Sequence, residues 1–251
     1  MKIGSIWIRF AAIWLLPLPL VAQAPAAITM DEEPHHHLAL RNDFAKVFAV
    51  QVSPGDSIVL HRHDQDTIAI AIGNQTVTVG VPGKPDIHQM NADAQVRLQR
   101  SGYVHSTRVD GATPYHTVAV ELLRPQANFR NLCAAVLASE PLHCSTTPAK
   151  LSSASSSDPL LESDQTRVRL VRVRPHRSMN LTGSSDSDDA SRLIVVLDAA
   201  SISADSPKEL EKALRPGDFV WLDGGHQPAR VFRNTSSKEV RFVDIAFLRV
   251  P

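Results

Sequence analysis

A repeat divides the chain into two similar halves. Four residues of the first half fall on identical residues of the second half at a constant shift of 121 positions: Val47, Val50, Val52 and Pro54 on Val168, Val171, Val173 and Pro175. Near the end of each half, residues 120–124 resemble residues 245–249 at a shift of 125, so the second copy holds a few extra residues. Such a long internal period indicates that both halves fold as the same kind of unit.

Short runs of alternating apolar and polar residues fill both copies, for example residues 75–80 and 241–249, and turn residues separate them. This spacing predicts an all-β protein, either a sandwich or a barrel in each half. One helix is expected over Pro207–Leu214, because a proline stands in its first turn and Pro216-Gly217 would end it. We interpret this helix as an insertion in the second copy.

The N-terminus has the pattern of a secretory signal peptide. Lys2 and Arg9 precede an apolar run over residues 10–21, and the small residues Ala22-Gln23-Ala24 follow as a cleavage site. Residues 1–24 are therefore predicted to be removed on export, which places the mature protein in the periplasm or outside the cell with no membrane segment. Pro25 disfavours cleavage after Ala24, so cleavage after Ala26 and an uncleaved anchor are alternatives.

Export changes the interpretation of the two cysteines, because an oxidising compartment permits disulfides. We expect Cys133 and Cys144 to form a local disulfide, and the alternative is two free thiols. They lie in residues 126–166, which we interpret as a cysteine-containing excursion followed by a serine-rich linker, since too few apolar residues are present to fold it. The predicted folded domains are residues 38–125 and 167–251.

Charge excludes one class of partner. Lys plus Arg equals Asp plus Glu at 26 each, and no basic block interleaved with aromatic residues is present. Nucleic acid is therefore not an expected partner.

His61-Arg62-His63 predicts a pair of metal ligands. Residues i and i+2 of a strand point to the same side, so the two imidazoles converge while Arg62 points away. Apolar residues precede this segment at 58–60 and follow it at 68–72, as expected for two buried strands joined by a polar turn. The neighbouring His35-His36-His37 cluster could bind copper, but we interpret it as a solvated segment before the first strand.

The segment from Gly55 to Gly73 resembles the first motif of the cupin superfamily. Its glycines, His61, His63 and an acid, Asp66, fill the places of that motif, although cupins commonly have glutamate one or two residues later. A second motif is similar at Ser101-Gly102-Tyr103-Val104-His105. The resemblance covers residues 38–125 and, loosely, 167–251, and it identifies the chain as a two-domain cupin, or bicupin, with two antiparallel jelly-roll barrels joined by the linker.

The resemblance implies one divalent transition metal ion in the first barrel, either iron, manganese, nickel, copper or zinc. His61, His63 and His105 would be its ligands, with Asp66 as a further ligand. In the second copy the corresponding positions hold Thr182, Ser184 and Arg230, none of which replaces an imidazole. The second barrel is therefore predicted to be a degenerate, metal-free cupin that supports the first.

The implied function is a metal-dependent reaction on a small organic molecule, of oxygenase or isomerase type. Asp66 and Tyr103 are the catalytic candidates, because an enzyme needs a general acid or base beside the ion. The alternative is a non-catalytic module that binds a ligand or senses a metal. Exposed barrel edges in this family often pair, so a homo-oligomer is also considered.

Overall fold

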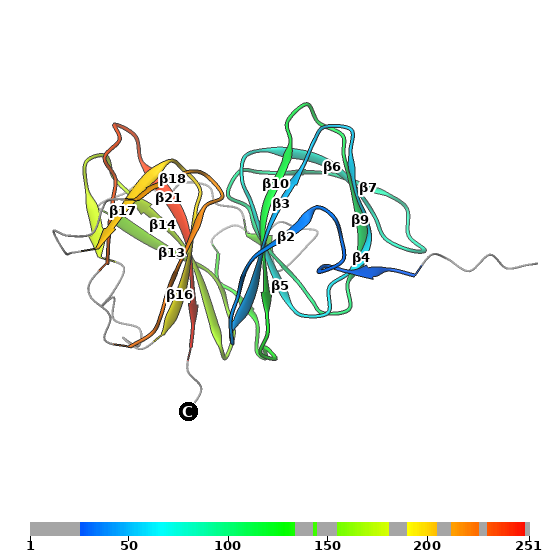
Figure 1. Ribbon diagram of the computed structural model, residues 1–251, viewed down its shortest axis with the longest axis horizontal. Helices are drawn as coiled ribbons and strands as arrows, with labels where there is room; N and C mark the ends of the chain where they lie inside the picture. The colour runs from blue at the N-terminus through cyan, green and yellow to red at the C-terminus, as the bar shows by residue number, and fades with distance from the viewer. Residues whose placement is uncertain are drawn as a thin grey trace, which may run out of the picture.

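A computed structural model of the chain describes residues 26–133, 143–144, 155–180, 190–204, 212–225 and 230–248. Over these residues the chain forms strands, turns and loops, without an α-helix, and the strands assemble into four sheets (Figure 1). The fold class is therefore all-β, as predicted. The described part of the chain contains no helix able to cross a membrane. The predicted signal peptide, residues 1–24, lies outside the described residues.

The first half forms a jelly-roll barrel from two sheets. Its outer sheet has the order β1 (Ile28–Thr29), β4 (Ser57–Arg62), β9 (Val104–Val109), β6 (Gln75–Gly80) and β7 (Ile87–Asn91). Its inner sheet has the order β12 (His143–Cys144), β8 (Val96–Gln99), β5 (Thr67–Ala71), β10 (Tyr115–Leu122), β3 (Ala45–Val52) and β2 (His36–Arg41). The pairing within both sheets is antiparallel except for the short β1, which runs parallel to β4.

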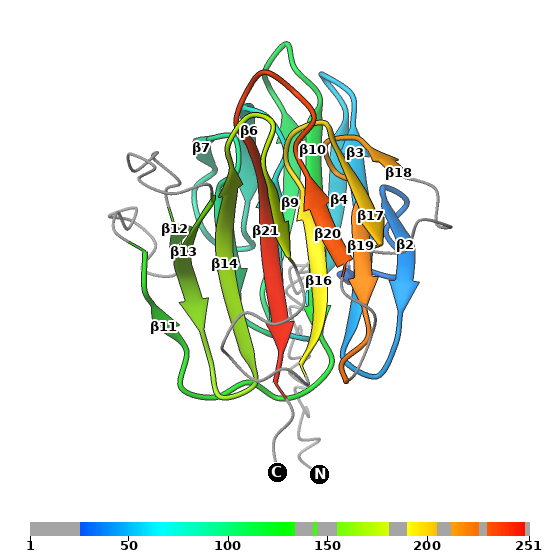
Figure 2. The ribbon, with the colours of Figure 1, turned by 90° about the vertical axis from the view of Figure 1, so that its left-hand side faces the viewer.

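The second half repeats this arrangement. Its inner sheet has the order β11 (Arg130–Asn131), β13 (Ser155–Glu162), β14 (Thr166–Val173), β21 (Val240–Phe247), β16 (Ser191–Val196) and β19 (Phe219–Leu222), as Figure 2 shows. Its outer sheet has the order β15 (Ser178–Asn180), β20 (Arg230–Arg233), β17 (Ala200–Ala204) and β18 (Lys212–Leu214).

The two inner sheets pack against each other, so the molecule has four layers. Along β10, Val118 and Val120 point out of the barrel and join one apolar cluster with Leu193 and Ile245 of the second half. Thr117 and the other alternate residues of β10 point into the first barrel, since successive side chains of a strand face opposite ways. The inner strands are therefore buried on both faces, which explains their continuous apolar sequences.

The pairing registers confirm the repeat. β3 and β14 are related by the shift of 121, and β10 and β21 are related by the shift of 125, with matching cross-strand partners. β15 still follows the shift of 121, whereas β16 follows the shift of 125. Extra residues of the second copy therefore lie between Asn180 and Ser191. Within the predicted insertion at Pro207–Leu214, Lys212–Leu214 are not extra residues, because β18 is the counterpart of β7.

The predicted helix over Pro207–Leu214 is wrong for its described residues. Lys212–Leu214 form β18, which pairs with β17 through Ala200 and Leu214, and residues 205–211 lie outside the described residues. Sheet pairing outweighs the local preference for a helix in so short a segment.

The predicted linker is also wrong in part. Ser155–Glu162 form β13, an eight-residue strand that pairs with β14 throughout most of its length. Leu160 and Leu161 of this strand are buried in the cluster between the inner sheets, which anchors a segment whose serines suggested a coil. Residues 145–154 lie outside the described residues. The disulfide between Cys133 and Cys144 stays a prediction.

Candidate metal centre

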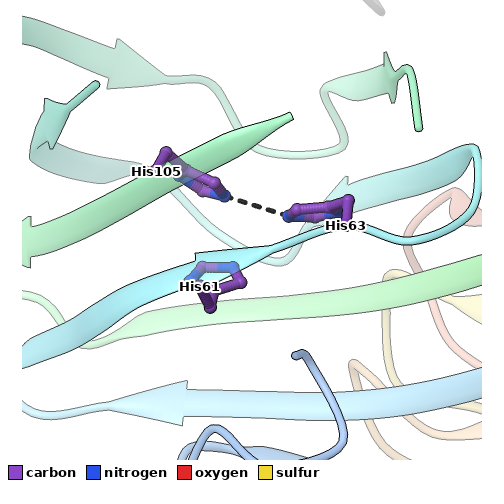
Figure 3. Close-up of side chains that lie close together, drawn as sticks. All are labelled: His61, His63 and His105. Carbon is purple, nitrogen blue, oxygen red and sulfur yellow. Dashed lines mark hydrogen bonds between the residues drawn. The ribbon is translucent and has the colours of Figure 1, made fainter. Parts of the chain in front are cut away.

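Three histidines of the first barrel meet at one point (Figure 3). His61 lies on β4 directly opposite His105 on β9, and His63 follows the end of β4. One nitrogen from each ring lies within 4.8 Å of the other two, and all three residues are buried. Within the described residues this is the one such group of potential metal ligands. The structure thus brings together His61, His63 and His105, as predicted from the spacing.

In His61 and His63, a hydrogen bond at Nδ1 orients the ring so that Nε2 points to the meeting point of the three histidines. His61 donates from Nδ1 to the carbonyl oxygen of Val59 at 2.9 Å, which leaves Nε2 with its lone pair. Nδ1 of His63 lies 3.0 Å from the hydroxyl oxygen of Thr67, whose own hydrogen is donated to Gln65. Such outer partners fix the ring orientation and tautomer of metal-binding histidines.

Two observations show that the Nε2 atoms of the three histidines are suited to bind a metal ion. Nε2 of His61 is buried without a hydrogen-bond partner in the described structure, which is costly unless something else binds it. Nε2 of His63 lies 3.0 Å from Nε2 of His105. Nitrogens that share one ion at about 2.1 Å stand roughly 3 to 4 Å apart, so only small adjustments are needed. Imidazole suits iron, manganese, nickel, copper and zinc.

Burial keeps the three imidazoles neutral, as metal binding requires. Desolvation lowers the pKa of His61 to about 4 and that of His63 to about 3. Desolvation also lowers the pKa of His105 well below its ordinary value, with a further contribution from the neighbouring His61 and His63. At neutral pH the site therefore presents unprotonated nitrogens to an ion.

The histidines line a small cavity inside the barrel, of about 20 Å³. Its other walls are His36, Val50, Ile58, Ala69, Gln99, Tyr115, Thr117 and Ala119. A space of this size holds one water molecule or an ion but no organic molecule. Ala69 and Ala119 are cross-strand partners on β5 and β10, and their small side chains leave the space that the imidazoles face.

Sequence reasoning missed two residues of this site, His36 and Glu33. His36 is buried beside His61, with ring centroids 4.8 Å apart, so the interpretation of this segment as solvated is wrong for His36. Glu33 accepts a hydrogen bond from Nδ1 of His36 at 2.8 Å. Burial alone would raise the pKa of Glu33, but hydrogen bonds from His36 and His35 outweigh it and lower the pKa to about 2.

Asp66 lies outside the group of converging ligands. Its carboxylate accepts a hydrogen bond from the backbone N–H of Ser101 at 2.9 Å and pairs with Arg100 at 3.2 Å. These contacts fix the turn before β9, so Asp66 does not join the three histidines as a ligand in this arrangement, and its catalytic role stays a prediction. Tyr103 stacks on His105 with ring centroids 4.7 Å apart, but it is not among the residues that line the cavity.

The second barrel has lost the space as well as the ligands. At the shift of 125, Thr107 and Thr117 correspond to Phe232 and Phe242, whose rings lie 4.4 Å apart in an apolar cluster. Ala69 corresponds in the same way to Ile194. Arg230 begins β20, the counterpart of β9, whereas Thr182 and Ser184 lie outside the described residues. Large apolar side chains thus occupy the interior where the first barrel has its cavity.

The sequence matches no protein-family model and no curated protein. Solved structures nevertheless share its fold. AerE from Microcystis aeruginosa aligns with a TM-score of 0.54 and 9% identity, over 86% of this chain and 99% of that one. A cupin 2 conserved barrel domain protein from Leptotrichia buccalis aligns with a TM-score of 0.53 and 8% identity, over 84% of this chain and 87% of that one.

A salicylate 1,2-dioxygenase from Pseudaminobacter salicylatoxidans aligns with a TM-score of 0.52 and 11% identity, over 81% of this chain and 71% of that one. The same enzyme is known in adducts with gentisate. At such low identities these likenesses establish the fold and leave the activity to be argued from the site.

Proposed function

We propose that this chain, which has the cupin fold, binds one divalent transition metal ion in its first barrel and acts through it on a small organic molecule. The observation that supports this best is the convergence of His61, His63 and His105, buried and neutral, on one point. A bound ion would supply a Lewis acid or a binding place for dioxygen. The protein would hold the ion, exclude bulk water and keep Nε2 of His61 and His63 unprotonated through the partners of Nδ1.

One of the structural neighbours suggests which compounds to test first. The salicylate 1,2-dioxygenase has been solved with gentisate, so aromatic hydroxy acids are reasonable first probes. The cavity of about 20 Å³ is far too small for such a ring, so its walls would have to move to admit one. The small volume favours a second candidate function, a non-catalytic module that binds or senses the metal.

Metal analysis of the protein purified from its native compartment tests the site. We expect one transition metal ion per chain, and loss of that ion in a His61→Ala, His63→Ala double variant. The matched control is a His35→Ala, His37→Ala double variant, which removes two imidazoles that do not line the cavity. Equal metal content in the parent and the His61, His63 variant would refute the site.

Oxygen uptake separates the two candidate functions. Metal-loaded protein is given salicylate or gentisate in an oxygen electrode, with the His61→Ala variant as control. Uptake that depends on His61 supports an oxygenase. Stoichiometric metal binding without uptake, and without any change of the metal spectrum when either compound is added, supports the non-catalytic module.

We further propose that the protein is exported and that Cys133 and Cys144 are joined. The support is the pattern of residues 1–24 and the oxidising environment that export provides. Mass spectrometry of the secreted or periplasmic protein should show a chain beginning at Pro25 or Ala27 with no free thiol after denaturation. An intact N-terminus or two titratable thiols would contradict the respective proposal.

A further inference from the structure

An ionisable pair of the N-terminal segment lies beside the cavity: His36 lines it, and Glu33 is bonded to His36. β1 pairs in parallel with β4 at His61. The turn after β1 places Glu33 next to His36, the first residue of β2. The side chain of Glu33 is fully buried. His36 lines the cavity from the side of β2, whereas the three converging histidines lie on or next to β4 and β9.

Glu33 holds His36 in one orientation and is itself anchored to the ligand strand. One carboxylate oxygen accepts hydrogen bonds from Nδ1 of His36 and the N–H of His35, both at 2.8 Å. The other oxygen accepts from the N–H of Val59 at 3.2 Å, and the carbonyl of Val59 accepts from Nδ1 of His61. The same carboxylate thus positions His36 and, through one peptide unit, supports a metal ligand.

The other ring nitrogen of His36 is available. Among the described residues Nε2 of His36 has no hydrogen-bond partner, while the ring lines the cavity. Because the carboxylate of Glu33 accepts the hydrogen of Nδ1, Nε2 of the neutral ring carries a lone pair. His36 is not part of the group of three whose nitrogens converge within 4.8 Å. It therefore stands beside the ion site without being a ligand in this arrangement.

We propose that His36, positioned by Glu33, accepts a hydrogen bond from a water-sized, hydrogen-bearing ligand on the open side of the metal ion. This inference rests on the proposed metal site and adds to it the polar group that recognises what the ion binds. The size of the cavity sets the ligand class, because about 20 Å³ admits one molecule such as water beside the three imidazoles. Asp66, the acid of the resembled motif, cannot take this role because it faces Ser101 and Arg100.

Fluoride tests the inference, since it is close to water in size but has no hydrogen to donate. Protein loaded with Co²⁺ is titrated with fluoride at pH 8, and binding is followed by the visible absorption of the metal. In the parent protein, fluoride must displace a water that donates a hydrogen bond to Nε2 of His36. Fluoride cannot donate this hydrogen bond, so the exchange loses it. A His36→Leu variant has no such bond to lose, so we expect it to bind fluoride about fivefold more tightly.

Two controls separate this effect from damage to the site. Affinity for Co²⁺, measured by competition with a coloured chelator, should change less than about threefold in His36→Leu, because the three ligands remain. His37→Leu, at the exposed neighbouring position, should bind fluoride like the parent. Unchanged or weaker fluoride binding in His36→Leu would overturn the inference.

A crystal structure of the Co²⁺-loaded parent gives an independent answer if the leucine variant does not fold. It should place a water on the ion within hydrogen-bond distance of Nε2 of His36. Direct coordination of the ion by His36, or a different group at that water, would refute the inference. Failure of the underlying metal site looks different, because Co²⁺ would then bind to His61→Ala as tightly as to the parent.

Discussion

At the scale of single residues, the buried imidazoles make the stability of the metal-free protein depend on pH. In the unfolded chain a histidine titrates near 6.5, whereas burial lowers the pKa of His61 to about 4 and that of His63 to about 3. At a pH between the folded and the unfolded pKa values, the unfolded chain binds more protons than the folded protein. The free energy of unfolding therefore falls as the pH drops below about 6.5. At pH 5 the loss should be roughly 2 kcal/mol for each of these two histidines.

Urea unfolding of the metal-free protein at pH 7, 6 and 5 measures this loss. In a His61→Leu variant, the decrease in the free energy of unfolding between pH 7 and pH 5 should be smaller by about the contribution of one histidine, because leucine takes up no proton. A free energy of unfolding that stays constant from pH 7 to pH 5 would show that the imidazoles are not buried as neutral groups.

The hydroxyl of Thr67 is a second residue whose effect can be measured. It accepts the hydrogen of Nδ1 of His63, so Thr67→Val leaves that nitrogen without its partner while keeping the branched shape of the side chain. Loss of such an outer partner lowers metal affinity by about 10- to 100-fold. Competition with a chelator should show this decrease, and Thr76→Val, at an exposed position of β6, should leave the affinity unchanged. Equal affinities in the two variants would contradict the role of Thr67.

These residues also show what the sequence could and could not reveal about the site. His61 and His63 are two apart on one strand, so their convergence follows from strand geometry alone. His36 belongs to β2, an edge strand of the other sheet, and it reaches the cavity only because the barrel closes. Asp66 stands near the place of the motif's acid, but the Ser101 N–H and Arg100 bind its carboxylate, and no pattern in the sequence shows these contacts.

At the scale of strands, the second barrel keeps the framework and fills the interior. Phe232 and Phe242 take the places of two threonines, so restored ligands would find no space between the sheets. A Thr182→His, Ser184→His, Arg230→His triple variant should therefore still bind one metal ion per chain. Metal stoichiometry of the purified variant tests this, and a second ion per chain would show that the apolar interior can be reorganised.

Strand pairing also explains which elements could be predicted. β3 and β14, and likewise β10 and β21, have enough alternating valines for the repeat to be visible in the sequence. β18 is too short for such a pattern, and its residues seemed to end a helix because Pro216-Gly217 follows them. What makes Lys212–Leu214 a strand is its pairing with the preceding strand β17, and three residues are too few for that pairing to leave an alternating pattern in the sequence.

At the scale of the whole molecule, the two barrels are joined by more than a connecting segment. Residues of both inner sheets form one apolar cluster, and Phe44 of the first half lies 5.9 Å from Trp221 of the second. Arg241 pairs with Asp93 of the first half at 2.7 Å and with Asp198 of its own half at 2.8 Å. The second barrel thus covers the face of the sheet whose other face lines the histidine cavity, which is a structural role for a barrel whose own interior is filled by apolar side chains.

The turn before β19 provides a test of this interface. Gly217 has a φ of 90°, and a Cβ at this position would overlap the ring of His116 on β10 of the other barrel. Gly55, in the turn between β3 and β4, has a similar φ of 87°, and its Cβ would meet nothing within 4 Å. Gly217→Ala and Gly55→Ala therefore share the backbone strain, and only Gly217→Ala adds the collision between the barrels.

We expect Gly217→Ala to lower the free energy of unfolding by about 1–2 kcal/mol more than Gly55→Ala does. In a His116→Ala background the ring is gone, so the two substitutions should then cost the same. Urea unfolding of the four variants and their parents gives this comparison directly. Equal costs in the presence of His116 would mean that the barrels do not meet at this turn in solution, and the second barrel could not then support the sheet behind the metal site as the packing indicates.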